Sequence, residues 1–375
     1  MSRETFQPLR GVRVVDFTRL LAGPYATMAL AELGADVVKI EMPDGGDETR
    51  SWGPPFVHGA SAYFHAINRG KRSVALDLKN PDHVERVLRL IEGSDVVVES
   101  FRPGVADRLG IGAQAVLARA PYVVYASING YGSAGPLAGE PATAVTVEAE
   151  SGLMFITGYE GGEPVRSGVA MVDIATGLSM INAVLAALLE RQRTGRGRRV
   201  EVSLYATALS SLGTVVAAAS GGAPPRPWGS GHASIVPYRA FAGRDGYVVL
   251  GATNDPMFVR LADALGLARE LGRPEWRGNA GRVRERELLE PMIAARVAKL
   301  AVEEVVARLR EHRVLVARVR RPDAAARDEQ ARALGLVDVD DGLLITRSAL
   351  GANGTRRLSR APDLGEHTAE VLGDH

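Results

Sequence analysis

A single aspartate in an apolar setting, Asp173, is the residue whose type and position best suit it to take part in chemistry. The apolar residues 169–172 before it favour a short buried strand, and the apolar spacing from 178 to 188, after Gly177, favours a helix. Ligands of open α/β sheets bind at the carboxyl ends of the strands, so a carboxylate between these elements is a candidate site residue. The alternative is that Asp173 only caps the helix, because aspartate is a favoured N-cap residue.

The residue content excludes several other kinds of site. The chain has no cysteine, so disulfides, thiolate metal sites and a cysteine nucleophile are ruled out. The histidines form neither an H-x-H nor an H-E-x-x-H pattern, so we predict no metal site. The turn at residues 19–24 lacks the G-x-G-x-x-G fingerprint, and no G-x-x-x-x-G-K-[ST] motif is present. Neither a dinucleotide site nor the simplest nucleotide site is therefore indicated.

The elements that must position Asp173 belong to a chain of ordinary globular composition. Its 375 residues are enough for two domains, with 46% hydrophobic and 24% charged residues. The net charge of +1 gives no reason to expect nucleic acid or an anionic membrane as a partner. The first residues are polar, and no uninterrupted apolar run reaches the roughly 18 residues that a membrane span needs. We therefore predict a cytoplasmic protein that contacts no membrane.

Alternating strand and helix patterns in the first half predict a doubly wound α/β domain. Residues 11–18 favour a buried strand, 22–33 a helix and 36–41 a second strand, which together make a βαβ unit. A further helix is predicted over 81–92, with a proline in its first turn. Further strands are predicted over residues 73–78, 95–101, 122–128 and 198–205.

The second half of the sequence predicts a different arrangement of helices and strands. Residues 204–220 are small and apolar and predict a buried helix, and the Gly- and Pro-rich residues 221–234 predict a linker. Asp245 and Gly246 predict the turn of a hairpin. Beyond it, helices are predicted over 255–266, 284–299, 302–312 and 323–335, and a strand over 314–320. We predict a smaller α+β domain over residues 225–320.

Several stretches, in one order along nearly the whole chain, resemble the family III CoA-transferases, the group that includes formyl-CoA transferase, carnitine CoA-transferase and the α-methylacyl-CoA racemases. They are LLAGPYATMALAELGADVVKIE, GGDETR, NRGKRSVALDLK, VVVESFRPGVADRLGIG, SINGYGSAGP, SGVAMVDIATG, TGRGRRVEVSL and APDLGEHTAEVL. The resemblance implies a Rossmann-like large domain from both chain ends, here 1–200 and 325–375, with a smaller domain in between, and we assign residues 201–224 to a linker. It also implies that two subunits interlock as a homodimer.

The resemblance assigns roles to particular residues. Asp173 corresponds to the nucleophile, which forms a mixed anhydride with the acyl group and then an aspartyl-CoA thioester. The glycine-rich loop that covers this anhydride corresponds to Gly229, Ser230, Gly231 and His232. The positions that resemble the CoA-binding segments are Leu21, Ala22, Leu76, Lys79, Ser100, Phe101, Arg102 and Arg108. CoA enters as part of the substrate, with carboxylic acids as its partners in exchange, and no permanently bound cofactor is expected.

The chain departs from the family pattern before Asp173. Ala144 stands where formyl-CoA transferase has a glutamate near the nucleophile, and Glu148 stands where the family usually has glutamine. Glu148 or Glu140 could supply a carboxylate instead. Thr143 stands where the racemases have a histidine base, which argues against α-proton exchange on an acyl-CoA. The alternatives to a CoA-transferase are such a racemase or a non-catalytic CoA-binding subunit of a heteromer.

Overall fold

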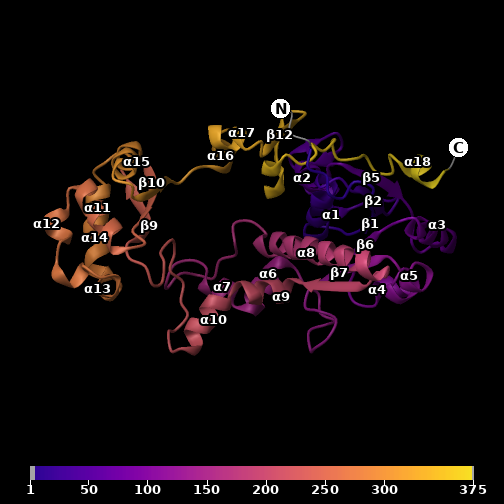
Figure 1. Cartoon of the computed structure of the whole chain (residues 1–375), viewed down its shortest axis with the longest axis horizontal. Coiled ribbons are helices and arrows are strands. Elements are labelled where there is room, and N and C mark those ends of the chain that lie inside the picture. The colour runs from indigo at the N-terminus through magenta and orange to yellow at the C-terminus, as the bar shows by residue number, and fades with distance from the viewer. Residues whose placement is uncertain (1–4, 374–375) are drawn as a thin grey trace. The chain divides into compact units, whose positions relative to one another are not determined.

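The computed structural model describes residues 5–373, which form two compact units. The first unit comprises the chain up to residue 154, residues 166–224 and the chain from residue 326 onward. The second unit comprises residues 155–165 and 225–325. In Figure 1 the indigo and yellow ends of the colour scale meet in the first unit, which is therefore built from segments far apart in the sequence.

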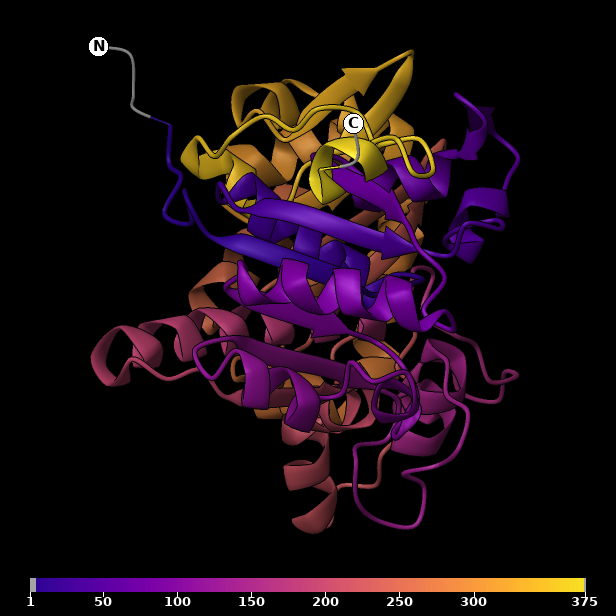
Figure 2. The same cartoon turned by 90° about the vertical axis from the view of Figure 1, so that its right-hand side faces the viewer.

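A six-stranded parallel sheet forms the centre of the first unit, which confirms the predicted α/β class. The strand order is β5-β2-β1-β6-β7-β8, and every neighbouring pair is parallel. The strands are β1 (Arg13–Phe17), β2 (Asp36–Glu41), β5 (Lys71–Ala75), β6 (Val96–Glu99), β7 (Val124–Asn129) and β8 (Arg199–Ser203). Figure 2 shows the indigo and purple strands running side by side. From β1 the strands β2 and β5 follow toward one edge of the sheet, whereas β6, β7 and β8 follow toward the other edge. The point between β1 and β6 is therefore a topological switch point.

Alternate residues of the strands enter two separate cores because side chains of a strand point to opposite faces. Val14 and Val96 pack with helices on one face, whereas Val15 and Val97 pack on the other. The first face carries α1 (Ala22–Glu32), α6 (Ala144–Ser151), α8 (Met171–Thr194) and α9 (Leu204–Ser211). The second carries α3 (Pro81–Glu92), α4 (Val105–Arg108), α5 (Ala113–Arg119) and α18 (Thr368–Leu372). Burial on both faces explains why the strands read as continuous apolar runs.

Helix α8 corrects the strand predicted over residues 169–172. No strand precedes Asp173, because the helix begins at Met171 and Asp173 lies in its first turn. The buried positions Val172, Thr176 and Met180 follow a helical period that starts before Gly177, so the end of the apolar run, from Met171, already belongs to the helix. The helix ends at Gly195, whose φ of +68° is left-handed. By length and composition α8 could cross a membrane, but a helix in the core of a folded domain meets the same criterion.

Residues 201–224, assigned above to a linker, belong to the first unit and contain secondary structure. They hold the end of β8, helix α9 and helix α10 (Gly213–Ser220). The predicted buried helix over 204–220 is therefore two helices, and only α9 has buried side chains. The predicted tail helix over 323–335 is also divided, into α16 (Pro322–Ala326) and α17 (Glu329–Ala333).

Smaller elements complete the first unit, and its tail covers one edge of the sheet. They are β3 (Phe56–Val57), β4 (Ala60–Ser61), α2 (Ala62–Asn68), β12 (Val337–Asp340) and β13 (Leu343–Thr346), whereas α7 (Leu153–Ile156) spans the boundary between the first and second units. The backbone N–H of His367 donates to the carbonyl of Ser73 at 2.9 Å, and the hydroxyl of Thr368 accepts from the N–H of Ala75 at 3.0 Å. The tail thus occupies the free edge of β5.

The second unit is an antiparallel sheet with helices packed on it, as the hairpin at Asp245 and Gly246 predicts. Its strands are β9 (Tyr238–Gly243), β10 (Gly246–Gly251) and β11 (Leu315–Arg318), in the order β11-β10-β9. Its helices are α11 (Asp255–Leu265), α12 (Ala268–Leu271), α13 (Asn279–Arg284), α14 (Arg286–Val297) and α15 (Val302–Glu311). One hydrophobic core around Trp276 and Leu250, both fully buried, joins these elements.

Candidate active site

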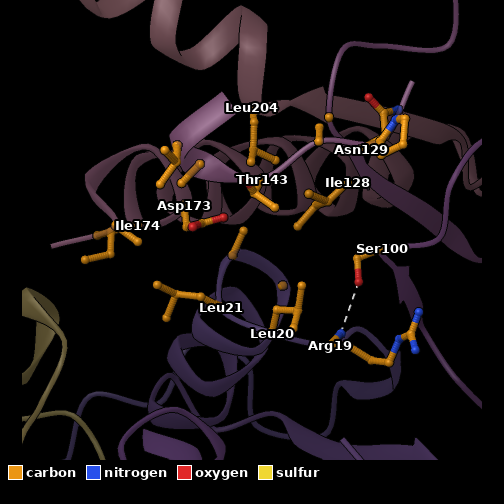
Figure 3. A pocket seen from close by; sticks show the side chains of 18 of the residues that line it. Arg19, Leu20, Leu21, Ser100, Ile128, Asn129, Thr143, Asp173, Ile174 and Leu204 are labelled. Carbon is orange, nitrogen blue, oxygen red and sulfur yellow. Dashed lines mark hydrogen bonds between the residues drawn. The ribbon is translucent and has the colours of Figure 1, made fainter. Parts of the chain in front are cut away.

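A cavity of about 820 Å³ opens at the switch point of the first unit. Its walls include the turns that follow three neighbouring strands: residues 19–23 after β1, 100–103 after β6 and 128–130 at the end of β7. Figure 3 shows Arg19, Ser100 and Asn129 gathered at one side of the cavity and Asp173 at the other. The backbone N–H of Arg19 donates to the Ser100 hydroxyl at 3.0 Å and ties two of the turns together. The cavity is therefore where an open α/β sheet is expected to bind its ligand.

Two buried ion pairs hold the turn after β1. Lys39 Nζ lies 2.9 Å from Asp47 Oδ2 and 2.7 Å from the carbonyl oxygen of Thr18. Lys71 Nζ lies 3.0 Å from Asp16 Oδ2, and all four charged side chains are fully buried. Burial alone would raise the pKa of Asp16, but Lys71 and Lys39 lower it to about 2. The carboxylate is thus ionised across the physiological range and accepts hydrogen bonds from the N–H and the hydroxyl of Thr18, at the start of this turn.

The same network supports an unusual backbone conformation at Leu20. This residue lines the cavity with φ of +68°, a left-handed value that costs about 1 to 2 kcal/mol for a residue with a Cβ. The backbone N–H of Leu20 reaches Asp47 Oδ1 at 3.5 Å, and the same oxygen accepts from the N–H and hydroxyl of Thr49. The buried pair between Lys39 and Asp47 therefore stabilises a turn that would otherwise relax away from the cavity.

Asp173 presents its carboxyl group to the cavity from the first turn of α8 (Figure 3). It is not the N-cap of that helix, because the N-cap position is Ala170. Burial, and then the negative charge of Glu148, raise the pKa of Asp173 to about 6. Within residues 5–373 no cation forms an ion pair with this carboxylate. The group is therefore ionised at neutral pH but poorly solvated and uncompensated, as a reactive nucleophile requires.

Helix α6 carries residues of the segment that differs from the family pattern, and it places them at the same cavity. Ala144 and Glu148, one turn apart, both line it, and Glu148 is only 2% exposed. Glu148 Oε2 accepts a hydrogen bond from the N–H of Ser167 at 2.9 Å. Thr143 is the N-cap of α6 and takes part in a capping box with Thr146. Glu148 is thus the buried carboxylate near Asp173, whereas the hydroxyl of Thr143 caps the N-terminus of α6.

Two aromatic residues that sequence reasoning missed form another part of the wall. Tyr63 and Trp52 pack edge to face, with ring centroids 5.4 Å apart. Burial, and then the charge of Asp173, raise the pKa of Tyr63 to about 12. Its hydroxyl therefore stays protonated and can donate a hydrogen bond to an oxygen in the cavity. The only available signal was their position between two of the matched stretches, GGDETR and NRGKRSVALDLK, since an isolated aromatic residue usually belongs to a core.

The predicted CoA-binding residues divide into two groups. Leu21, Ala22, Ser100, Phe101 and Arg102 all line the cavity. Leu76 is buried at 2% exposure in the core of the second face, and Lys79 and Arg108 are exposed outside the cavity wall. Of the predicted CoA-binding residues, only the first group therefore lies together around the cavity.

The predicted loop lies in the second unit and is held by that unit. The N–H of Gly229 donates to the carbonyl of Gly158 at 2.6 Å, and a Cβ at Gly229 would lie 2.3 Å from the ring of Tyr159. Gly229 has φ of +59°, the Ser230 hydroxyl accepts from the N–H of Ala240, and the N–H of His232 donates to the carbonyl of Tyr238. Gly231 follows within the same turn. The role of this loop over Asp173 stays a prediction.

Among residues 5–373, no three histidine, aspartate or glutamate side chains converge as a metal ion would require. Asp173 and Glu148 approach each other without a third such ligand.

Comparison with known proteins gives a consistent result. The model of CoA-transferase family III matches residues 9–368. The chain is 44% identical over 306 residues to succinyl-CoA:glutarate CoA-transferase of Mus musculus, covering 81% of this chain and 69% of that protein. It is 34% identical over 385 residues to succinate–glutarate CoA-transferase of Agrobacterium fabrum, covering 98% and 95%. Among solved structures, a CAIB/BAIF family protein from Brucella suis superposes with a TM-score of 0.89 at 34% identity, covering 99% of this chain and all of that one.

Proposed function

The chain belongs to CoA-transferase family III, and from this premise we propose that it moves CoA between dicarboxylic acids through covalent intermediates on Asp173. The assignment as a CoA-transferase rests on the family. The choice of substrate is supported by the mouse and Agrobacterium relatives, whose names specify succinate and glutarate. The role of Asp173 is supported by its carboxyl group, which faces the cavity as an unpaired anion with a pKa of about 6.

In the first half of the proposed reaction, the Asp173 carboxylate attacks the thioester carbonyl of the acyl-CoA. The carbon–sulfur bond breaks, CoA leaves as a thiolate, and the acyl group and Asp173 form a mixed anhydride. The thiolate then attacks the Asp173 carbonyl carbon, which releases the donor acid and leaves an aspartyl-CoA thioester. No proton is transferred in either step, so the carboxylate needs no separate base.

The second half repeats these exchanges in reverse. The acceptor carboxylate attacks the aspartyl thioester, expels the CoA thiolate and forms a second anhydride. The thiolate attacks the acyl carbonyl of that anhydride, which yields the new acyl-CoA and restores the Asp173 carboxylate. The protonated hydroxyl of Tyr63 can stabilise oxyanions formed along this path. Because an anhydride hydrolyses readily, water must be excluded, and the segment proposed for this is the loop Gly229–Ser230–Gly231–His232.

Racemisation is the less favoured reaction. Proton exchange α to a thioester needs a base beside the substrate, and no histidine is among the described residues that line the cavity. Thr143, at the position of the racemase histidine, caps α6. A non-catalytic CoA-binding subunit is also less favoured, because such a chain has no need to keep a carboxylate with a raised pKa in its cavity.

Oxygen-18 tracing tests the covalent route directly. The protein is incubated in D₂O with succinyl-CoA and glutarate labelled in both carboxylates, and products and the Asp173 peptide are read by mass spectrometry. We expect glutaryl-CoA, with ¹⁸O delivered to Asp173 and then to released succinate. Transfer with an unlabelled Asp173 would refute the covalent route but keep the transferase. Deuterium at the α-carbon without a new thioester would instead establish a racemase.

The variant Asp173→Ala provides the companion measurement. It removes the nucleophile from a partly exposed position, so the fold and the affinity for CoA should survive while turnover is lost. Full activity in this variant would refute the proposed mechanism. Loss of CoA binding together with activity would show that Asp173 holds the site together and would leave the labelling result to decide its chemistry.

A further inference from the structure

Arg166 is a cation in the cavity that the proposed mechanism does not use. It lines the same space as Asp173 and Tyr63, and its side chain is exposed. Its Nε donates to the carbonyl of Ser167 at 3.3 Å. Within residues 5–373 no carboxylate forms an ion pair with its guanidinium, whereas Arg19 of the same cavity is paired with Glu48 at 3.3 Å. Arg166 is therefore positioned to bind an anion supplied from outside the chain.

The backbone next to Arg166 is anchored beside the nucleophile. The N–H of Ser167 donates to Glu148, the buried carboxylate whose charge raises the pKa of Asp173. The charges of Asp173 and Arg166 both act on the hydroxyl of Tyr63: Asp173 raises the pKa of this group and Arg166 lowers it. The guanidinium thus belongs to the end of the cavity where the acyl group must react.

The charges at this end explain why a cation is needed there. Asp173 and Glu148 already place two carboxylates close together, so a substrate with another carboxylate would be repelled without compensation. The pantetheine arm of CoA is uncharged. Arg102, a predicted CoA-binding residue of the cavity whose charge suits a phosphate, follows a different strand, β6. Arg166 is therefore available to bind a negative charge on the acyl group itself.

Resting on the proposed function, we propose that Arg166 binds the distal carboxylate of a dicarboxylic acyl group and so selects dicarboxylic over monocarboxylic acids. A guanidinium presents paired N–H groups that match a carboxylate, and such charge-assisted bonds are stronger than neutral ones. The reacting carboxylate exchanges with Asp173 while the distal carboxylate stays on Arg166. The same contact serves donor and acceptor, since both occupy the acyl position in turn.

Internal competition between acceptors tests this assignment. Succinyl-CoA is given with equal concentrations of glutarate and valerate, which have the same chain length and differ in the distal carboxylate. The ratio of glutaryl-CoA to valeryl-CoA reports acceptor selection alone, because both products come from the same loaded enzyme. We expect Arg166→Gln to lower this ratio about 10- to 100-fold, and Arg166→Lys, which keeps the charge but loses the paired geometry, to lower it less.

Arg102→Gln is the matched control, because Arg102 is an exposed arginine of the same cavity that is predicted to bind CoA. It should slow formation of both products and leave their ratio unchanged. An unchanged ratio in Arg166→Gln, or a wild-type enzyme that favours valerate, would overturn the role of Arg166 while the transferase proposal stands. A wild-type enzyme that forms neither thioester would overturn the dicarboxylate proposal and this inference with it.

Discussion

Replacing Glu148 with glutamine should shift the acid limb of the pH–rate profile to lower pH. Asp173 must be ionised to attack, so kcat/KM falls as pH drops through its pKa of about 6. Glutamine removes the neighbouring negative charge but keeps an oxygen that can accept the hydrogen bond from Ser167. The substitution therefore changes the electrostatics of the nucleophile with little change in shape.

The size of the shift follows from the two causes that raise this pKa. Burial is the larger cause and the charge of Glu148 the smaller, so Glu148 supplies less than half of the rise from 3.8 to about 6. The acid limb should move down by less than about one pH unit. At pH 5 only about a tenth of Asp173 is ionised in the wild type, so Glu148→Gln should raise kcat/KM there by at most about fivefold. Above pH 8 the two proteins should be alike.

The measurement is kcat/KM from pH 4.5 to 8.5 with succinyl-CoA and glutarate. Glu140→Gln is the control, since Glu140 lines the same cavity but does not contribute to the raised pKa of Asp173. Its limb should stay at the wild-type pH. An acid limb that stays in place or moves upward in Glu148→Gln would refute the assignment of Glu148 as the charge acting on the nucleophile.

Three further predictions concern stability. The pKa of Asp173 in the folded state lies above its unfolded value, so ionisation of this carboxyl group destabilises the fold. Asp173→Asn should therefore raise the free energy of unfolding by about 1 to 3 kcal/mol above pH 6. Urea melts should show that this gain vanishes below pH 4, where the aspartate is protonated in both states. Lys39→Met leaves Asp47 buried without its cation and should cost about 3 to 5 kcal/mol by the same assay; a smaller loss would mean that water reaches the pair. A Cβ at Gly177 would lie 2.7 Å from a backbone carbonyl of α1, so Gly177→Ala should lower the Tm and lose about 1 to 3 kcal/mol, whereas Gly213→Ala, with open space, should not.

Much of the architecture could be predicted because both cores follow simple periodicities. The helix over residues 81–92 and the strand over 36–41 have the predicted bounds, each fixed by local signals such as the proline at the start of the helix. The strand predicted before Asp173 was wrong, because four apolar residues fit either a strand or a helical turn. Only the long buried face of α8 decides between them.

The site could be predicted only in part, because a cavity depends on side chains that carry no local signal. Asp173, Leu21 and Ser100 were identified by resemblance and do line one cavity. Arg166 and Tyr63 were missed, since an exposed arginine and an isolated tyrosine are ordinary surface and core residues. The buried pair of Lys39 and Asp47 was missed for the opposite reason, because sequence patterns place such residues in solvent.

The tail that covers strand β5 has a consequence for biosynthesis. Gly365 donates to Ser73 across 292 residues of sequence, so the edge of β5 stays unpaired until that later segment emerges from the ribosome. At usual rates of translation this interval is about 15 to 60 s. During that time an open parallel-sheet edge can pair with the edge of another nascent chain. Chaperone occupancy of the growing polypeptide should therefore end only after residues 365–372 have been made.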